Sequence, residues 1–114
     1  MARPIKRRQI CQLPKVVEFV PLQSCTGQID MTIDEYESIR LIDHLGLSQA
    51  ECAQQMKVAR TTVQAIYESA RHKLADALVC GKRLSIRGGV YDICPHAHGC
   101  CGKPCPRRQM GGDF

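Results

Sequence analysis

Residues 47–78 read LSQAECAQQMKVARTTVQAIYESARHKLADAL, and their apolar spacing decides the fold. Ser48 and, three residues later, Glu51 form a capping box, which predicts the start of a helix. The helical pattern stops at residues 57–59 and resumes at Arg60. The stretch therefore predicts two helices joined by a short turn, the arrangement of a helix-turn-helix.

The same spacing predicts which faces of the two helices are buried. The first helix presents Ala53 and Met56 inward. The second carries one continuous apolar stripe at helical intervals, made up of Val63, Ile66, Tyr67, Ala70, Leu74 and Leu78. A helix-turn-helix places a small residue at the helix crossing, an apolar residue in the turn and two buried anchors after it. Those places are filled here by Ala53, Val58, Val63 and Ile66.

The outward face of the second helix is polar near its N-terminus. The residues there are of types that contact DNA bases and adjacent phosphates, namely Arg60, Thr61, Thr62 and Gln64. The N-terminal residues of a recognition helix enter the major groove, where Gln can form two hydrogen bonds with adenine. Double-stranded DNA is therefore the expected partner, and packing in a plain helical bundle is the alternative. Further DNA contacts are expected from Arg71, Lys73, Ser48 and Gln49 and, in the N-terminal arm, from Arg3, Lys6, Arg7 and Arg8.

Charge is segregated along the chain, whose formal net charge is +5. Residues 1–15 contain five bases and no acid, and residues 16–56 contain one base and seven acids. Residues 57–90 contain seven bases and two acids. Positive charge confined to the arm and to the segment of the second helix suits a polyanionic partner. We expect the arm to enter the minor groove, as basic N-terminal arms do.

A support helix is predicted ahead of the helix pair. Thr32 and Glu35 form its capping box, and Gly46 is its expected C-terminal stop. Asp34, Glu35 and Glu37 crowd its first turn and are expected to make its exposed side acidic. Because phosphates would repel that side, this helix is predicted to support the DNA-reading helix.

An extended segment and a loop are predicted between the basic arm and the support helix. Residues 16–20, VVEFV, predict a strand or an extended segment packed on the domain, and residues 22–31 predict a loop. With 114 residues, 4% of them aromatic, the chain is long enough for one domain with a small aliphatic core. Cys52 and Cys80 are expected to be core residues or idle thiols.

Cysteine and histidine are concentrated in residues 91–114. The candidate metal ligands there are Cys94, His96, His98, Cys100, Cys101 and Cys105. Thiolates and imidazoles are ligands of zinc, and four thiolates suit an iron–sulfur cluster equally well. Adjacent Cys100 and Cys101 do not easily bind one metal ion together, so a tail histidine, or Cys11 and Cys25, would complete the shell. The alternative is a redox-sensitive tail without a specific metal site.

Other classes of protein are not indicated. No apolar run approaches the length of a membrane span, and the basic N-terminus leads into no hydrophobic signal region, so a cytoplasmic protein is expected. In a reducing compartment the eight cysteines favour thiols or metal ligands over disulfides. An enzyme is not expected, since Cys94 and His96 lie in a tail without an oriented base or oxyanion site. No small-molecule substrate is indicated.

The order of several motifs resembles that of a protein family. The resemblance rests on MARPIKRRQICQLP at the start, on FVP, on IDEYESIRLIDHLGLSQAECAQQMKVARTTVQAIYESARHKLADAL and on GKRLSIRGG. These resemble an uncharacterised bacterial and archaeal family of short proteins with a predicted sigma-factor-region-four-like helix-turn-helix. The resemblance covers roughly residues 1–91 and implies a DNA-binding transcriptional regulator. It extends to members found beside, or joined to, domains related to iron-molybdenum cofactor assembly, which implies a metal-linked role.

Two residues depart from the usual turn of that family. Lys57 stands where Gly is usual, and a side chain held at positive φ costs about 1 kcal/mol relative to glycine. Ala59 stands where Ser usually caps the second helix, which loses about 1 kcal/mol of capping. We expect the uncapped amides near Arg60 to meet a DNA phosphate.

The sequence as a whole predicts a mostly α-helical fold. A three-helix helix-turn-helix domain is expected at residues 32–80, after a basic arm and extended segment at residues 1–31. A short extended segment at residues 81–90 and an irregular Cys/His-rich tail at residues 91–114 would follow.

The expected function is sequence-specific DNA binding in transcription regulation, with the tail sensing a metal or the redox state. A homodimer is expected because one short recognition helix reads few bases. The alternative function is that of a metal-binding accessory protein in metal-cofactor assembly that docks a protein instead of DNA.

Overall fold

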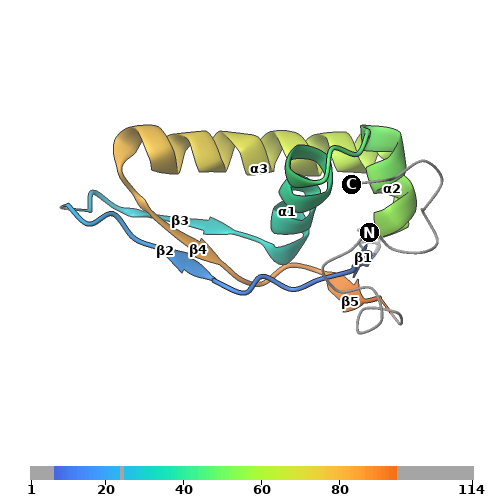
Figure 1. The fold of residues 1–114 in the computed structure, drawn as a ribbon, viewed down its shortest axis with the longest axis horizontal. Helices are drawn as coiled ribbons and strands as arrows, with labels where there is room; N and C mark the ends of the chain where they lie inside the picture. Colours follow the sequence, from blue (N-terminus) through green and yellow to red (C-terminus); the bar gives the residue numbers. More distant parts are fainter. Residues whose placement is uncertain (1–6, 24, 95–114) are drawn as a thin grey trace, which may run out of the picture.

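A computed structural model describes residues 7–23 and 25–94 of the chain. The elements follow one another as β1 (Arg8–Ile10), β2 (Glu18–Phe19), β3 (Gln28–Met31), α1 (Ile33–Ser38), η1 (Ile39–His44), α2 (Gln49–Met56), α3 (Arg60–Cys80), β4 (Arg83–Ile86) and β5 (Tyr91–Ile93). Figure 1 shows α3 lying over a layer of short strands, with α1 and α2 beside its N-terminal half. Helices and small strands together form this fold.

The capping boxes begin α1 and α2 as predicted. The Glu35 amide donates to Thr32 Oγ1, and the Thr32 amide donates to Glu35 Oε1 at 2.9 Å. Ser48 and Glu51 make the same reciprocal pair at 2.9 and 3.1 Å. Gly46 follows the support helix at a φ of 81°, which confirms it as the C-terminal stop.

The support helix changes its hydrogen-bonding pattern halfway along. After Ser38 the chain continues as η1, a π-helical segment in which the Leu45 amide donates to the Arg40 carbonyl five residues back, at 3.0 Å. π-helical turns are rare and are frequently found at functional sites.

The strands form two small sheets. β1 and β5 pair in parallel, and β4 lies between β2, which is antiparallel to it, and β3, which is parallel to it. A parallel pair needs a crossover connection. Here all four helical segments lie in the connection from β3 to β4, so this sheet joins the two ends of the helical unit.

The prediction of a loop at residues 22–31 was wrong for its last four residues. Gln28 pairs with Arg83 and Met31 with Ile86, and Met31 is only 2% exposed. The strand depends on a partner more than fifty residues away in the sequence, so local turn signals did not reveal it.

One core joins the helices to the strands. Its fully or nearly fully buried members include Ile10, Met31, Leu41, Cys52, Met56, Val63, Ala70 and Ile86. The inward positions of Ala53 and Met56 are confirmed, and Cys52 is a core residue.

Two apolar segments are exposed against expectation. Residues 16–20 contribute β2 but do not pack inward: Phe19 and Val20 are each 53% exposed. The apolar stripe of α3 is also interrupted, because Leu74 is 41% and Leu78 is 82% exposed. This half of α3 packs on β3 and β4 through Ala77, but Leu74 and Leu78 stay exposed, so helical spacing alone overestimated the width of the buried stripe.

None of the helices in residues 7–23 and 25–94 combines the length and apolar character that a bilayer span requires.

Candidate nucleic-acid interface

The turn between α2 and α3 is tight and fully hydrogen-bonded at its start. Lys57 adopts the left-handed conformation, with φ 58° and ψ 45°. Its amide donates to the Gln54 carbonyl at 3.3 Å, and the Val58 amide donates to the Ala53 carbonyl at 3.1 Å. These bonds close the C-terminal end of α2 in the way a glycine usually does. The positive φ expected at Lys57 is confirmed.

Within the part of the chain that the structure describes, the first turn of α3 has no side-chain cap. Ala59 has extended backbone, and its methyl side chain makes no hydrogen bond to the amides that follow it. Arg60, Thr61 and Gln64 are exposed, and Thr62 is half-buried. On the opposite face Val63 is 0% exposed and Ile66 only 7%, which fixes the helix against α1 and α2. An amide-rich, cationic helix end therefore faces outward.

The other residues of α2 and α3 that were predicted to contact DNA differ in exposure and in the bonds that they already make within the protein. Ser48 is exposed but its hydroxyl caps α2, and Gln49 is half-buried. The Arg71 side chain is 63% exposed, lies 5.5 Å above the Tyr67 ring and has Nε 3.8 Å from Asp43. The Lys73 ammonium binds Glu35 at 2.8 Å and is less exposed.

The predicted basic arm is tied to the fold where the structure describes it. Arg7 donates to Asp92 at 2.6 Å, and both side chains are more than half exposed. Arg8 lies in β1 with Nε 3.3 Å from Asp34, and both side chains are mostly buried. Arg3 and Lys6 lie outside the described residues.

The acidic residues of α1 are buried, so the prediction of an acidic exposed side was wrong. Asp34 and Glu35 are below 9% exposed and Glu37 is fully buried. Glu37 accepts hydrogen bonds from Arg40 at 2.7 and 2.8 Å and from the Cys11 amide at 2.9 Å. Each carboxylate has a basic partner inside the fold, and two of those partners, Arg8 and Lys73, come from the segments with excess positive charge. Part of the charge segregation therefore serves folding.

Glu35 connects the first turn of α1 to the middle of α3. Ser69 donates to its carboxylate at 2.6 Å and Lys73 at 2.8 Å, and the Thr32 amide bonds to it as well. Burial by itself would raise the pKa of Glu35, but these hydrogen bonds outweigh burial and lower it below 4.5. The carboxylate therefore stays charged at neutral pH.

Asp43 connects η1 to α3. It accepts a hydrogen bond of 2.8 Å from the Tyr67 hydroxyl and lies beside Arg71. Desolvation and the hydrogen bond to Asp43 both raise the pKa of Tyr67, which keeps the phenol protonated. The face of α3 that bears Arg71 is thereby linked to the support helix.

The predicted metal ligands fall mostly outside the described residues. His96, His98, Cys100, Cys101 and Cys105 all lie there. Cys94 is 2% exposed, and its amide donates to the Ile10 carbonyl at 2.7 Å, so it sits beside buried Cys11. Cys25 precedes β3, and its neighbour Thr26 donates its amide to the carbonyl of Gly81 at the C-terminal end of α3. No cluster of three metal-binding side chains occurs within residues 7–23 and 25–94.

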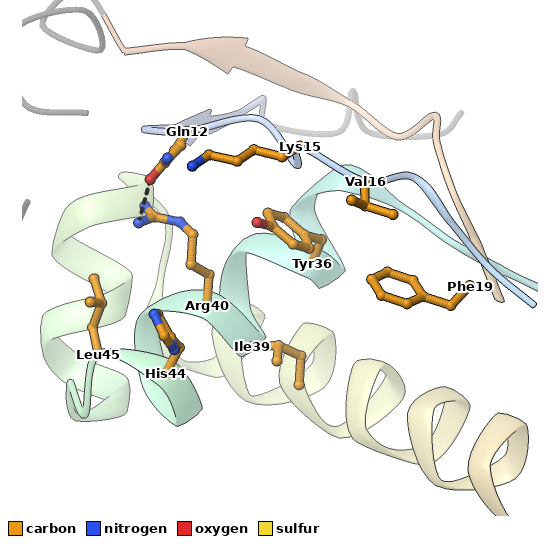
Figure 2. Close-up of a pocket in the computed structure, with 9 residues that line it drawn as sticks. All are labelled: Gln12, Lys15, Val16, Phe19, Tyr36, Ile39, Arg40, His44 and Leu45. Atoms are coloured by element: carbon orange, nitrogen blue, oxygen red, sulfur yellow. Dashed lines mark hydrogen bonds between the residues drawn. The ribbon is translucent and has the colours of Figure 1, made fainter. Parts of the chain in front are cut away.

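A cavity beside the support helix was not predicted from the sequence. It has a volume of about 460 Å³ and lies between residues 12–19 and the α1–η1 helix (Figure 2). Lys15, Tyr36, Arg40 and His44 are among the side chains that line it. The local signal for it was the apolar run at residues 16–20, which the sequence predicted to pack on the domain and which instead lines the cavity through Val16 and Phe19.

The chain was compared with known families and proteins. A family described as "Protein of unknown function DUF134" matches residues 1–94. The chain belongs to this family. A UPF0251 protein of Desulfitobacterium hafniense (strain DSM 10664 / DCB-2) is 53% identical to it, over 97% of this chain and 93% of that protein.

Two further relatives of this DUF134 protein carry the same family name. A UPF0251 protein of Caldicellulosiruptor saccharolyticus is 49% identical over 90% of this chain and 76% of its own length. UPF0251 protein DET0218 of Dehalococcoides mccartyi is 43% identical over 96% of this chain and 94% of its own length. No solved structure matches the chain.

Proposed function

We propose that this protein binds double-stranded DNA sequence-specifically through α2 and α3, as a helix-turn-helix transcriptional regulator. The observation that carries the proposal is the first turn of α3. Arg60, Thr61 and Gln64 are exposed there, while Val63 and Ile66 anchor the opposite face of the helix in the core. A helix held in this way presents side chains to a groove from a rigid support.

The exposed residues supply complementary kinds of contact. Gln64 suits the paired donor and acceptor of adenine, and Arg60 suits guanine or a phosphate. Thr61 has a hydroxyl and a methyl group, which reach base edges or phosphates. The uncapped amides after Ala59 donate to a phosphate at the positive end of the helix dipole. Base reading and phosphate anchoring then come from one turn of helix.

Phosphate contacts around this turn are assigned to the cations with the greatest exposure. Arg71 keeps most of its surface open, and exposed Lys57 lies in the turn itself. Lys73 and Arg8 are given a structural role because each is paired with a carboxylate of α1. The footprint is therefore smaller than the sequence predicted.

Two copies are proposed to act together through the C-terminal half of α3. Leu74, Leu78 and Val79 are exposed there, and a groove of about 340 Å³ runs between α3 and the apolar segment Phe19–Val20. The charges at this face are already matched, because Asp76 pairs with Lys82 and Glu18 with Arg83. A face that is apolar and internally neutral is suited to a second copy of itself.

The length of α3 agrees with such a dimer on DNA. Thr62 and Leu78 are sixteen residues apart, which is about 24 Å along the helix. Two helices that meet near Leu78 at roughly a right angle would hold their reading ends about 34 Å apart, one helical turn of DNA. The two recognition turns would then enter successive major grooves on one side of the duplex.

The test is a binding experiment with labelled duplex DNA. The wild-type protein should bind random duplex at about 50 mM salt, lose affinity steeply toward about 200 mM, and enrich a two-fold symmetric site from a random pool. Arg60→Ala and Gln64→Ala should each weaken the enriched site by about 1–3 kcal/mol. Arg87→Ala removes an exposed charge at the end of β4 and serves as the control. Absence of binding at low salt would refute the proposal.

The tail is proposed as a zinc or iron–sulfur site that gives the regulator a metal or redox input. Its donor set supports this, since Cys94, His96, His98, Cys100, Cys101 and Cys105 are all ligand types for these metals. Anaerobic purification with metal analysis should find stoichiometric zinc in a colourless protein, or iron with absorption near ~400 nm. Purification without either metal would remove the metal input. Stoichiometric metal without DNA binding would favour the accessory role in cofactor assembly.

A further inference from the structure

The cavity beside the support helix has a polar end and an apolar end. Figure 2 shows Gln12, Lys15 and Arg40 grouped at one end, with Val16 and Phe19 at the other. Its volume of about 460 Å³ lies in the range of pockets that hold small molecules, which are mostly apolar with a few convergent polar groups. The lining suits a small amphipathic molecule.

The polar end carries excess positive charge. Arg40 is neutralised by Glu37, which accepts two of its hydrogen bonds, and its third nitrogen donates to Gln12 at 3.2 Å. Lys15 is exposed and has no ion-pair partner among residues 7–23 and 25–94. Burial raises the pKa of Tyr36, so its hydroxyl remains a hydrogen-bond donor. An anionic group is the chemical complement of this end.

The opposite end of the cavity is lined by apolar side chains. Val16 and Phe19 are each 53% exposed, and Ile39 faces them from the support helix (Figure 2). An apolar body placed between them would remove exposed hydrocarbon surface from water on both sides of the cavity. The ligand that satisfies both ends therefore joins one anionic group to a small apolar or aromatic body.

The wall of the cavity is built by the π-helical segment. Ile39, Arg40 and His44 belong to η1, and Leu45 follows it directly. Because π-helical turns are rare and are frequently found at functional sites, their presence here is an observation independent of the charge. The residues of the π-helical segment are thus also residues that line the cavity.

The segment also touches the proposed DNA-reading helix. Asp43, the neighbour of His44 in η1, holds the Tyr67 hydroxyl and lies beside Arg71 of α3. A molecule in contact with His44 therefore acts on the segment that positions the exposed cation of α3. This is a short physical route between the cavity and the candidate interface.

We propose that the cavity binds a small organic anion, a carboxylate or phosphate on an apolar body, and that its occupancy alters DNA binding. The second part rests on the proposed function. The first part stands on the cavity alone, and it is tested on the protein without DNA.

Four probes separate the features of the ligand. Benzoate and phenyl phosphate carry an anion on a ring, benzamide is the neutral counterpart of benzoate, and inorganic phosphate lacks the apolar body. Backbone amide shifts in ¹⁵N–¹H NMR titrations should move for residues 12–19 and 36–45 with the first two probes. Benzamide should bind roughly tenfold more weakly, since a charge-assisted hydrogen bond is lost. Inorganic phosphate should produce no saturable shifts there.

Variants test the assigned contacts. Lys15→Met should weaken benzoate roughly tenfold and leave benzamide unchanged. Arg87→Met also removes one exposed cation, but outside the cavity lining, and should bind benzoate as the wild type does. Equal binding of benzoate and benzamide, or shifts that map away from the lining, would overturn the anion site. An equal effect of both variants would reduce it to general charge attraction.

The regulatory part is tested by measuring affinity for the enriched duplex with and without saturating benzoate or phenyl phosphate, whichever binds. A several-fold change that Lys15→Met abolishes supports it, and an unchanged affinity overturns it. If the protein binds no DNA, the proposed function and the coupling both fail, while the NMR titration still decides the anion site.

Discussion

The two halves of α3 share one helical spacing of apolar residues but differ in their surroundings. In the N-terminal half, Val63, Ile66 and Ala70 are buried against α1 and α2. In the C-terminal half, Leu74 and Leu78 point to solvent and only Ala77 is buried, near β3 and β4. Spacing identifies the residues that share a face of a helix. The presence of a covering element decides whether that face is core or contact surface.

Matched truncations in the two halves would show this difference most strongly. Ile66→Ala should lower the free energy of unfolding by about 2–5 kcal/mol, since it leaves a cavity in the core. At a concentration where the protein is monomeric, Leu78→Ala should change it by no more than about 0.5 kcal/mol, because the side chain is 82% exposed in the single chain. Urea unfolding followed by circular dichroism measures both. A comparable loss in the two variants would mean that the C-terminal half of α3 is covered within a single chain.

The exposed half should matter for association. The wild type is expected to sediment as a dimer, and Leu78→Glu as a monomer with an unchanged melting temperature at a concentration where both are monomeric. DNA affinity should fall by at least about tenfold, since one of two half-site contacts is lost. His72→Gln alters an exposed residue of α3 without adding charge to the apolar face, and it should remain dimeric. A wild type that stays monomeric at micromolar concentration would exclude this interface.

The junction between the two halves is expected to respond to acid. Glu35 holds Ser69 and Lys73 there, and its pKa is lowered below 4.5 on folding. A lowered folded-state pKa gives stability that is complete above the unfolded pKa and is lost as pH falls through the folded value. Glu35→Gln keeps the capping geometry and removes the titration.

The measurement is unfolding free energy against pH for both proteins. The difference in favour of the wild type should be constant above about pH 5 and shrink steadily below about pH 4.5. Glu68→Gln, at an exposed carboxylate of the same helix, provides the comparison. A difference that persists unchanged into acid would show that the charge of Glu35 contributes nothing.

Sequence reasoning located the features that depend on neighbours in the chain. Thr32 and Ser48 begin their helices because each cap bonds within its own turn. The turn at residues 57–59 and the outward placement of Arg60 and Gln64 follow from helical geometry in the same way. These are local rules, and one sequence is enough to apply them.

The missed features depend on residues far apart. β3 exists because it pairs with β4, and Asp34 is buried because it meets Arg8. Formal charge along the chain cannot distinguish an acid that repels DNA from one that pairs with an arm residue inside the fold. The cavity was missed for a similar reason: Lys15 and His44 are brought together only by packing of the arm on the support helix.

The smallest effects are expected at the turn that precedes the N-terminal half of α3. Lys57→Gly should stabilise the protein by up to about 1 kcal/mol. The backbone strain that glycine relieves at this left-handed position is larger than the entropic cost of ordering glycine, which is more flexible than lysine in the unfolded chain. Ala59→Ser should add about 1 kcal/mol by capping α3. Thermal or urea unfolding measures both changes in the free energy of unfolding.

The two turn variants separate stability from recognition. If the amides after Ala59 bind a phosphate, a serine hydroxyl at that place competes with DNA for them, and Ala59→Ser should be more stable without binding DNA more tightly. Ala75→Ser is the control: at this exposed site within α3 a serine cannot cap the helix, and the variant should be slightly less stable than the wild type. A clear gain in DNA affinity for Ala59→Ser would show that the uncapped turn is a defect of the helix and takes no part in phosphate binding.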